Sequence, residues 1–289
     1  GYWIADDINT LLNYDGNSKE VKLFTAEKSI RSRGTYMRTD DSSTPQYTEP
    51  SVTFDYSLTD KPKQPLTLQI LNVQGEVVNT FFSDTTGQKK PTEVIEDMSL
   101  NSITYVIDKK LDNSPGMHRF VWDMTATGPW HKSDNRRYKN GPMVVPGKYT
   151  ARLIVDDRSI EQPFELLPDP RLDATNTTVA DIEKQYAFTM ELQALLNEAR
   201  KLEEKLNEEL KTLKKEKEAS DQDKARMTEI ESLLEQLREK DITYPQPKII
   251  DQMEYLYYMT NGADQMMGKD AYDQLKVLEQ QFSEIKTKI

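Results

Sequence analysis

Hydrophobic and polar residues alternate along the middle of the chain, between residues 51 and 167. A period of two residues is typical of half-buried strands, because successive side chains point to opposite faces of a sheet. The clearest case is a hairpin of Lys148–Val155 and Arg158–Leu167 around an Asp156-Asp157 turn, and Trp122 and Tyr149 fall on inward positions. The same alternation recurs at Val52–Leu58, Leu66–Ile70, Ile103–Ile107 and Phe120–Met124. A turn at Asn72–Gly75 leads into Glu76–Phe82 and suggests a further hairpin. Short strands with no helix between them predict an antiparallel β-sandwich.

From residue 179 onward the apolar residues follow helical spacing. One stretch steps by 4, 3, 4, 3 and 4 residues, as a coiled-coil seam does, and a second steps by 3, 4 and 3. A turn at Glu218–Asp221 would fold them into an antiparallel hairpin, a break at Tyr244–Pro247 follows, and Ile249–Thr260 and Lys269–Lys288 would add two helices. Four amphipathic helices with short connections predict an up-down bundle. The seam residues are Phe188, Leu192, Leu195, Ala199, Leu202 and Leu206, then Met227, Ile230, Leu234 and Leu237.

Proline and capping residues set the boundaries between these regions. Two prolines in Leu167–Arg171 exclude a helix there, because each disfavours helical backbone in the residue before it. Thr177 or Thr178, with Asp181 three residues after Thr178, predicts the start of the first helix. Near the N-terminus, Tyr2–Ile4 and Val21–Phe24 are expected to form short strands. The expected regions are a terminal strand and linker (1–50), a β-sandwich (51–167), a proline-rich linker (168–178) and a helical bundle with a hairpin (179–289).

Composition and charge exclude several kinds of function. The 289 residues include 38 basic and 49 acidic ones, and the net charge of −11 argues against nucleic acid and anionic membranes as partners. Without cysteine, the chain has no disulfide, cysteine-bound zinc, iron–sulfur cluster or thiol catalysis. Two histidines are too few for a three-histidine metal site, and no apolar run is long enough for membrane insertion. The nearly balanced charges of Lys201–Lys240 are expected to face solvent and pair along the helix surface.

No recognisable catalytic pattern occurs in the sequence. His118 and His131 lack a nucleophile and an orienting acid in such a pattern, and there is no phosphate-binding or dinucleotide-binding loop. The adjacent aspartates Asp6-Asp7, Asp40-Asp41 and Asp156-Asp157 fit turns, with a calcium site as the alternative. We therefore expect no catalytic residue, no cofactor and no bound metal.

The long connection that contains residues 128–138 offers one candidate binding site. Long loops often carry function, and aromatic side chains next to Asn and Arg can stack on a sugar ring and bond its hydroxyls. The alternative is that the tryptophan simply packs this loop onto the sandwich or onto a neighbouring domain. The candidate carbohydrate contacts are Trp130, Asn135, Arg136 and Tyr138.

Six parts of the chain carry a family resemblance: Gly1–Leu11, Val21–Phe24 with Arg31, Gly116–Met124, Pro146–Leu153, Leu167–Arg171 and Pro247–Gln252. The first resembles the strand that closes the last blade of bacterial sortilin-like, BNR-repeat β-propeller proteins, which are often labelled glycosyl hydrolases. The third and fourth resemble the Ig-like module of those proteins, which is also similar to that of the flagellar hook-capping protein. The others resemble the linkers and the helical end of the same propeller proteins. No Ser-x-Asp-x-Gly-x-x-Trp Asp-box occurs, so propeller residues have no counterpart here. The resemblance implies an upstream β-propeller and a secreted, periplasmic or cell-surface location.

Together, these patterns and the resemblance predict an α+β, multi-domain protein. The expected fold is an Ig/fibronectin III-like antiparallel β-sandwich followed by an α-helical bundle with a coiled-coil hairpin. Our first hypothesis is a non-catalytic accessory region for protein–protein interaction, which packs on the propeller or forms a homodimer through its helices. A second is a carbohydrate-binding module of a glycoside hydrolase. A third is a glycosidase with acids near His131, which requires two carboxyl groups about 5–10 Å apart in one cleft.

Overall fold

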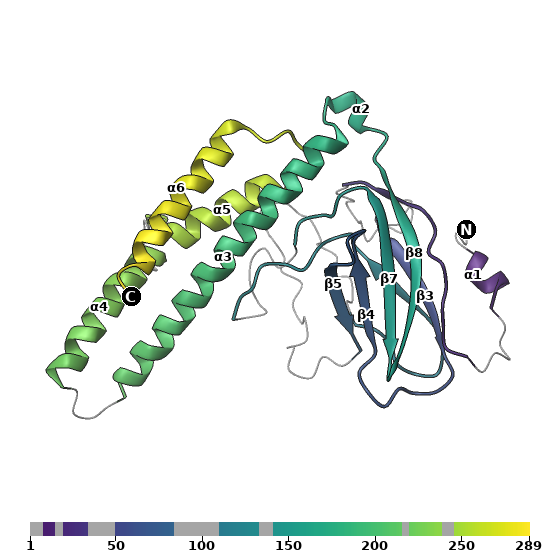
Figure 1. Ribbon diagram of the computed structural model, residues 1–289, viewed down its shortest axis with the longest axis horizontal. Coiled ribbons are helices and arrows are strands. Elements are labelled where there is room, and N and C mark those ends of the chain that lie inside the picture. The colour runs from purple at the N-terminus through teal and green to yellow at the C-terminus, as the bar shows by residue number, and fades with distance from the viewer. Residues whose placement is uncertain are drawn as a thin grey trace, which may run out of the picture. The chain divides into compact units, whose positions relative to one another are not determined.

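A computed structural model describes residues 8–14, 20–33, 50–83, 110–132, 141–215, 220–238 and 246–289 (Figure 1). The chain divides into two compact units. The β unit consists of Gly1–Thr127 and Met143–Asn176, and the helical unit consists of Gly128–Pro142 and Thr177–Ile289. The predicted features that lie outside the described residues are the Tyr2–Ile4 and Ile103–Ile107 strands, the Asp6-Asp7 and Asp40-Asp41 pairs, Asn135, Arg136 and Tyr138.

The described residues of the β unit form two sheets. In the three-stranded sheet, β1 (Lys22–Leu23) and β6 (Gly116–Trp122) both pair antiparallel with β3 (Val52–Leu58). The five-stranded sheet has the order β2-β8-β7-β4-β5, and its pairs are antiparallel except for β2 with β8. Its strands are β2 (Ser29–Arg31), β4 (Thr67–Leu71), β5 (Val77–Phe82), β7 (Gly147–Val155) and β8 (Arg158–Pro168). The unit also has two four-residue helices, α1 (Asn9–Leu12) and α2 (Leu172–Thr175).

Aromatic side chains form the core between these sheets. The Trp122 ring of β6 lies 6.3 Å from Tyr149 of β7 and 6.0 Å from Phe164 of β8, measured between centroids. Phe54 of β3 lies 5.1 Å from Phe164. The buried positions of Trp122 and Tyr149 and the hairpin turn at Asp156-Asp157 are therefore confirmed. The alternation identified these two residues because β7 and the end of β6 bury every second side chain.

The prediction of an Ig/fibronectin III-like antiparallel β-sandwich followed by a helical bundle is wrong. β2 runs parallel to β8, with Ile30 opposite Leu167, so the five-stranded sheet is mixed. A three-residue strand is too short to show an alternating pattern, which is why the sequence did not indicate β2. The chain also passes to the helical unit at residue 128 and returns at residue 143, so the helices are not a simple C-terminal addition. The coarser α+β class is correct.

Four long helices make up the described part of the helical unit: α3 (Val179–Leu213), α4 (Asp221–Leu237), α5 (Ile249–Asn261) and α6 (Lys269–Lys286). α3 and α4 each begin at a capping box. In each box, the hydroxyl of Thr178 or Ser220 accepts a hydrogen bond from a backbone N–H three residues later, and an aspartate carboxylate there accepts from the cap N–H. The helix start expected at Thr178 is confirmed.

The helices pack against α3 at different levels. α5 and α6 contact the N-terminal part of α3, where Tyr257 of α5 donates a hydrogen bond to Gln193 at 3.0 Å. α4 runs antiparallel to the C-terminal part, where its Arg226 pairs with Glu209 at 2.7 Å. The predicted up-down bundle of four helices is therefore wrong, because α4 and α5 follow one another along α3. Hydrophobic periodicity identifies a helix, but it does not show against which part of a longer helix that helix packs.

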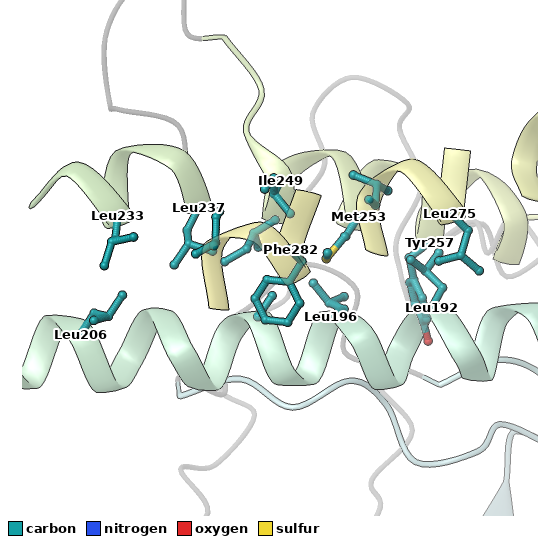
Figure 2. Close-up of a cluster of buried hydrophobic side chains, with 14 of the residues drawn as sticks. Leu192, Leu196, Leu206, Leu233, Leu237, Ile249, Met253, Tyr257, Leu275 and Phe282 are labelled. Atoms are coloured by element: carbon teal, nitrogen blue, oxygen red, sulfur yellow. The ribbon is translucent and has the colours of Figure 1, made fainter. Parts of the chain in front are cut away.

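The buried seam of α3 also differs from the predicted one. Figure 2 shows Leu206 facing Leu233 of α4, and Leu196 beside Phe282 of α6. Leu196 is fully buried, whereas the predicted seam residue Leu195 is only partly buried. A helix that contacts two neighbours buries a wider stripe than a strict coiled-coil seam.

Candidate functional site

Three polar side chains of α3 hold the chain segment around Trp130. The Asn197 carboxamide oxygen accepts a hydrogen bond from the Trp130 backbone N–H at 2.6 Å, and Arg200 Nη1 donates to the Trp130 carbonyl oxygen at 3.0 Å. Two residues later, Lys132 Nζ pairs with the Glu204 carboxylate, and this hydrogen bond raises the pKa of Lys132. We call Asn197, Arg200 and Glu204 the α3 clamp.

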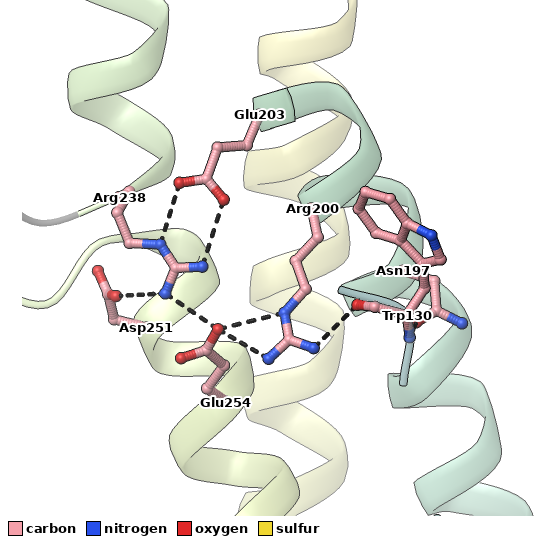
Figure 3. Close-up of polar contacts among 7 residues, drawn as sticks. All are labelled: Trp130, Asn197, Arg200, Glu203, Arg238, Asp251 and Glu254. Carbon is pink, nitrogen blue, oxygen red and sulfur yellow. Dashed lines mark hydrogen bonds and ion pairs between the residues drawn. The ribbon is translucent and has the colours of Figure 1, made fainter. Parts of the chain in front are cut away.

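The spacing of the α3 clamp follows from helix geometry. Positions 197, 200 and 204 differ by three and four residues, so their side chains lie on one side of α3. The segment they hold, residues 128–132, belongs to the same compact unit as the helices. We call it the docked segment. Within it, Pro129 is buried and Trp130 is half-buried, and Figure 3 shows the Trp130 indole beside Asn197.

Arg200 is buried, with 3% of its side chain exposed, and other charged groups fix its orientation (Figure 3). Its Nε and Nη2 donate to Glu254 Oε1 of α5 at 3.2 and 2.9 Å. Arg238, which follows α4, donates through Nη1 to the same oxygen at 2.9 Å and to Asp251 at 3.1 Å. Its Nε and Nη2 donate to the two oxygens of Glu203 at 3.1 and 3.3 Å. We call these five residues the arginine network.

Electrostatics explains how the arginine network remains charged while partly buried. Burial alone would lower the pKa of Arg238, but the hydrogen bond and charge of Glu203, with the charge of Glu254, raise it above its ordinary value. All three carboxylates of the network are hydrogen-bonded to arginine. The chemistry that this arrangement supports is recognition of a peptide backbone, because one arm of a buried guanidinium points to a carbonyl oxygen.

Other candidate groups have structural partners as well. Asp156 Oδ1 accepts hydrogen bonds from the backbone N–H groups of Lys63 and Gln64 at 2.8 and 2.9 Å, so it fastens a loop. His118 Nε2 lies 2.6 Å from the Ser114 carbonyl oxygen. Across the described ranges, no group of three or more His, Asp or Glu side chains is arranged to hold a metal ion.

The proposed carbohydrate contacts are only partly described. Trp130 is half-buried, and its backbone is bound by the α3 clamp. Asn135, Arg136 and Tyr138 lie outside the described residues. Only Trp130 of the four candidates is described, so carbohydrate binding stays a prediction.

Sequence analysis missed the α3 clamp and the arginine network, although one signal was available. Leu192, Leu196 and Arg200 are each four residues apart, so Arg200 continues a buried apolar row of α3. A charged residue in such a row requires partners from other elements. The pairing of Arg200 with Glu254, 54 residues later, cannot be read from spacing along one helix.

Comparison with known proteins adds no name to this arrangement. No protein-family model matches the chain, and a search of curated proteins finds no significant match. Within the residues that the structure describes, no helix is both long enough and apolar enough to cross a bilayer.

Proposed function

We propose that this chain is a non-catalytic structural and interaction region of a secreted, periplasmic or cell-surface propeller protein. In this role it packs on an upstream β-propeller or mediates association. The observation that carries the proposal is the hydrogen bonding of Trp130 to Asn197 and buried Arg200, through which the helical unit binds a chain segment by its backbone.

The role of the acidic side chains supports a structural function. The carboxylates of Glu203, Asp251 and Glu254 orient arginines, and Asp55 forms two hydrogen bonds of 2.8 Å to Arg119 across the three-stranded sheet. A glycosidase needs a carboxylic acid and a carboxylate that face a sugar. These four acids instead face arginine side chains of their own unit.

Packing on a neighbouring domain is supported by the segment that begins the described part of the chain. Ile8, Leu11, Leu12 and Tyr14 lie within seven residues, and each exposes between 38% and 74% of its surface. Four exposed apolar residues so close together are typical of a protein interface. The segment directly follows residues 1–7, which are part of the sequence that resembles a closing propeller strand.

The non-catalytic part of the proposal is tested with the purified chain and a panel of glycoside and peptide substrates. We expect no turnover above that of a boiled sample. Reproducible turnover that is lost when a single acid is replaced by its amide would overturn this part.

The parent protein is tested separately. Tandem blade repeats in the reading frame upstream of Gly1 would support it, and their absence would overturn it. In a protein that has such blades, Leu11→Asp with Leu12→Asp should accelerate proteolysis near residue 20, whereas Val73→Asp at an exposed turn should not. Equal rates in both variants would argue against packing through residues 8–14.

A further inference from the structure

We propose that the α3 clamp is a binding site for an extended peptide that carries an aromatic residue followed two positions later by a lysine. The docked segment of the chain itself, residues 128–132, is the occupant in this structure. The inference rests on the proposed function, because it names the kind of peptide that the interaction region binds. It requires neither a propeller nor an extracellular location.

The first argument is that the clamp reads a peptide backbone. Asn197 accepts from the N–H of Trp130 at 2.6 Å, and Arg200 donates to the carbonyl oxygen of the same residue at 3.0 Å. Both backbone groups of Trp130 are bound from the same helix, as both groups of one residue are bound by the same neighbour when strands pair. The two side chains therefore replace one partner residue of a sheet, and almost any amino acid could satisfy this part of the site.

The second argument concerns selectivity along the peptide. Glu204 lies one turn beyond Arg200 and pairs with Lys132, two residues after Trp130. The acidic side chain of Glu204 therefore favours a ligand that carries a positive charge two residues after its aromatic residue. The Trp130 side chain is half-buried, so an aromatic ring contributes apolar contact at the central position.

The third argument is that the site is formed by residues outside the docked segment. Arg200 is held by Glu254, which is held in turn by Arg238, and neither partner belongs to residues 128–132. The guanidinium is therefore already oriented when a peptide arrives, which reduces the entropy lost on binding. When the docked segment leaves, a buried N–H group of Arg200 loses its carbonyl partner, and an equivalent segment would restore that bond.

The experiment uses the full chain with the docked segment replaced, and a fluorescein-labelled peptide of residues 126–134. The replacements are Pro129→Gly, Trp130→Pro, His131→Gly and Lys132→Ser, and proline at position 130 has no N–H to donate to Asn197. Fluorescence anisotropy should show at least tenfold tighter peptide binding to the replaced chain than to the unmodified chain, whose site is already filled. Circular dichroism at 222 nm checks that the helices remain folded.

Two further variants of the replaced chain identify the site. Arg200→Met should weaken binding at least tenfold, because a hydrogen bond to a charged group contributes about 1.5–3 kcal/mol. Glu204→Lys should reverse the preference, so that a peptide with Lys132→Glu binds better than the unmodified peptide. Glu198→Lys, at an exposed position of α3, is the matched control and should leave binding unchanged.

The possible outcomes separate cleanly. Absence of binding to the folded replaced chain would overturn the inference, as would equal binding to the unmodified chain. If Arg200→Met does not fold, the Glu204→Lys variant alone tests the inference. An unchanged preference between the two peptides in that variant would overturn it. Failure here leaves the turnover and reading-frame tests of the proposed function untouched.

Discussion

Replacing Arg200 by methionine is the most direct test of how the helical unit is stabilised. Arg200 makes two hydrogen bonds to Glu254 and one to the Trp130 carbonyl oxygen. Breaking a buried ion pair by removing one partner costs about 3–5 kcal/mol. Glu254 keeps Arg238 at 2.9 Å, so less charge is left unpaired, and we expect the lower end of this range. A loss of about 3 kcal/mol would lower the melting temperature by roughly 10 °C for a unit of this size.

Thermal unfolding followed at 222 nm is the appropriate assay, because the long helices lie in the helical unit. Lys286→Met is the matched control. Its pair with Glu198 also joins α6 to α3, but the two side chains are 49% and 61% exposed, and such pairs contribute about 0–1 kcal/mol. The control should therefore melt within about 3 °C of the unmodified chain. Equal shifts for Arg200→Met and Lys286→Met would refute the reasoning that burial makes the arginine network important.

Four other substitutions test three separate parts of the fold. Thr178→Ala should destabilise α3 by about 1 kcal/mol in urea unfolding, because it removes the side chain that caps the helix. Leu196→Ala should cost about 2–5 kcal/mol, whereas Leu195→Ala at a partly buried position should cost clearly less; the reverse order would restore the predicted seam. Hydrogen bonds from Arg171 lower the pKa of Asp169 in the folded chain. The ionised carboxylate therefore stabilises the fold at pH values above the ordinary aspartate pKa of about 4. This stabilisation is lost as the pH falls through the lowered pKa of the folded chain. Asp169→Asn should therefore destabilise the chain at pH 7, and the difference should shrink below about pH 4; a difference that does not change with pH would contradict this assignment.

Residues that bury one face of a regular element were predictable from the sequence. Trp122 and Tyr149 belong to alternating strands, and the turn at Asp156-Asp157 was found because two such strands flank it. Helix starts were equally accessible, since Thr178 and Asp181 satisfy each other within four residues. In each case the signal lies within a few neighbouring residues, and in a strand it recurs at every second position.

Features that depend on distant partners were not predictable in the same way. Asp55 occupies a polar position of an alternating strand, yet it is 4% exposed and pairs with Arg119, 64 residues away. Only the fold determines that these two residues lie opposite each other on β3 and β6. The docked segment around Trp130 is a similar case, because its partner Asn197 lies 67 residues later in another region of the sequence.

The arginine network has a consequence for how the helices find their positions. Arg200 continues the buried row of Leu192 and Leu196, so α3 buries a charge when this row is covered by its neighbours. Sliding α5 by one helical turn would move Glu254 by about 5.4 Å, far beyond hydrogen-bond distance from Arg200. Apolar side chains would tolerate such a slip better than an unpaired buried guanidinium, which loses several kcal/mol. The network therefore penalises wrong registers of α5, in the way that buried polar groups specify register in coiled coils.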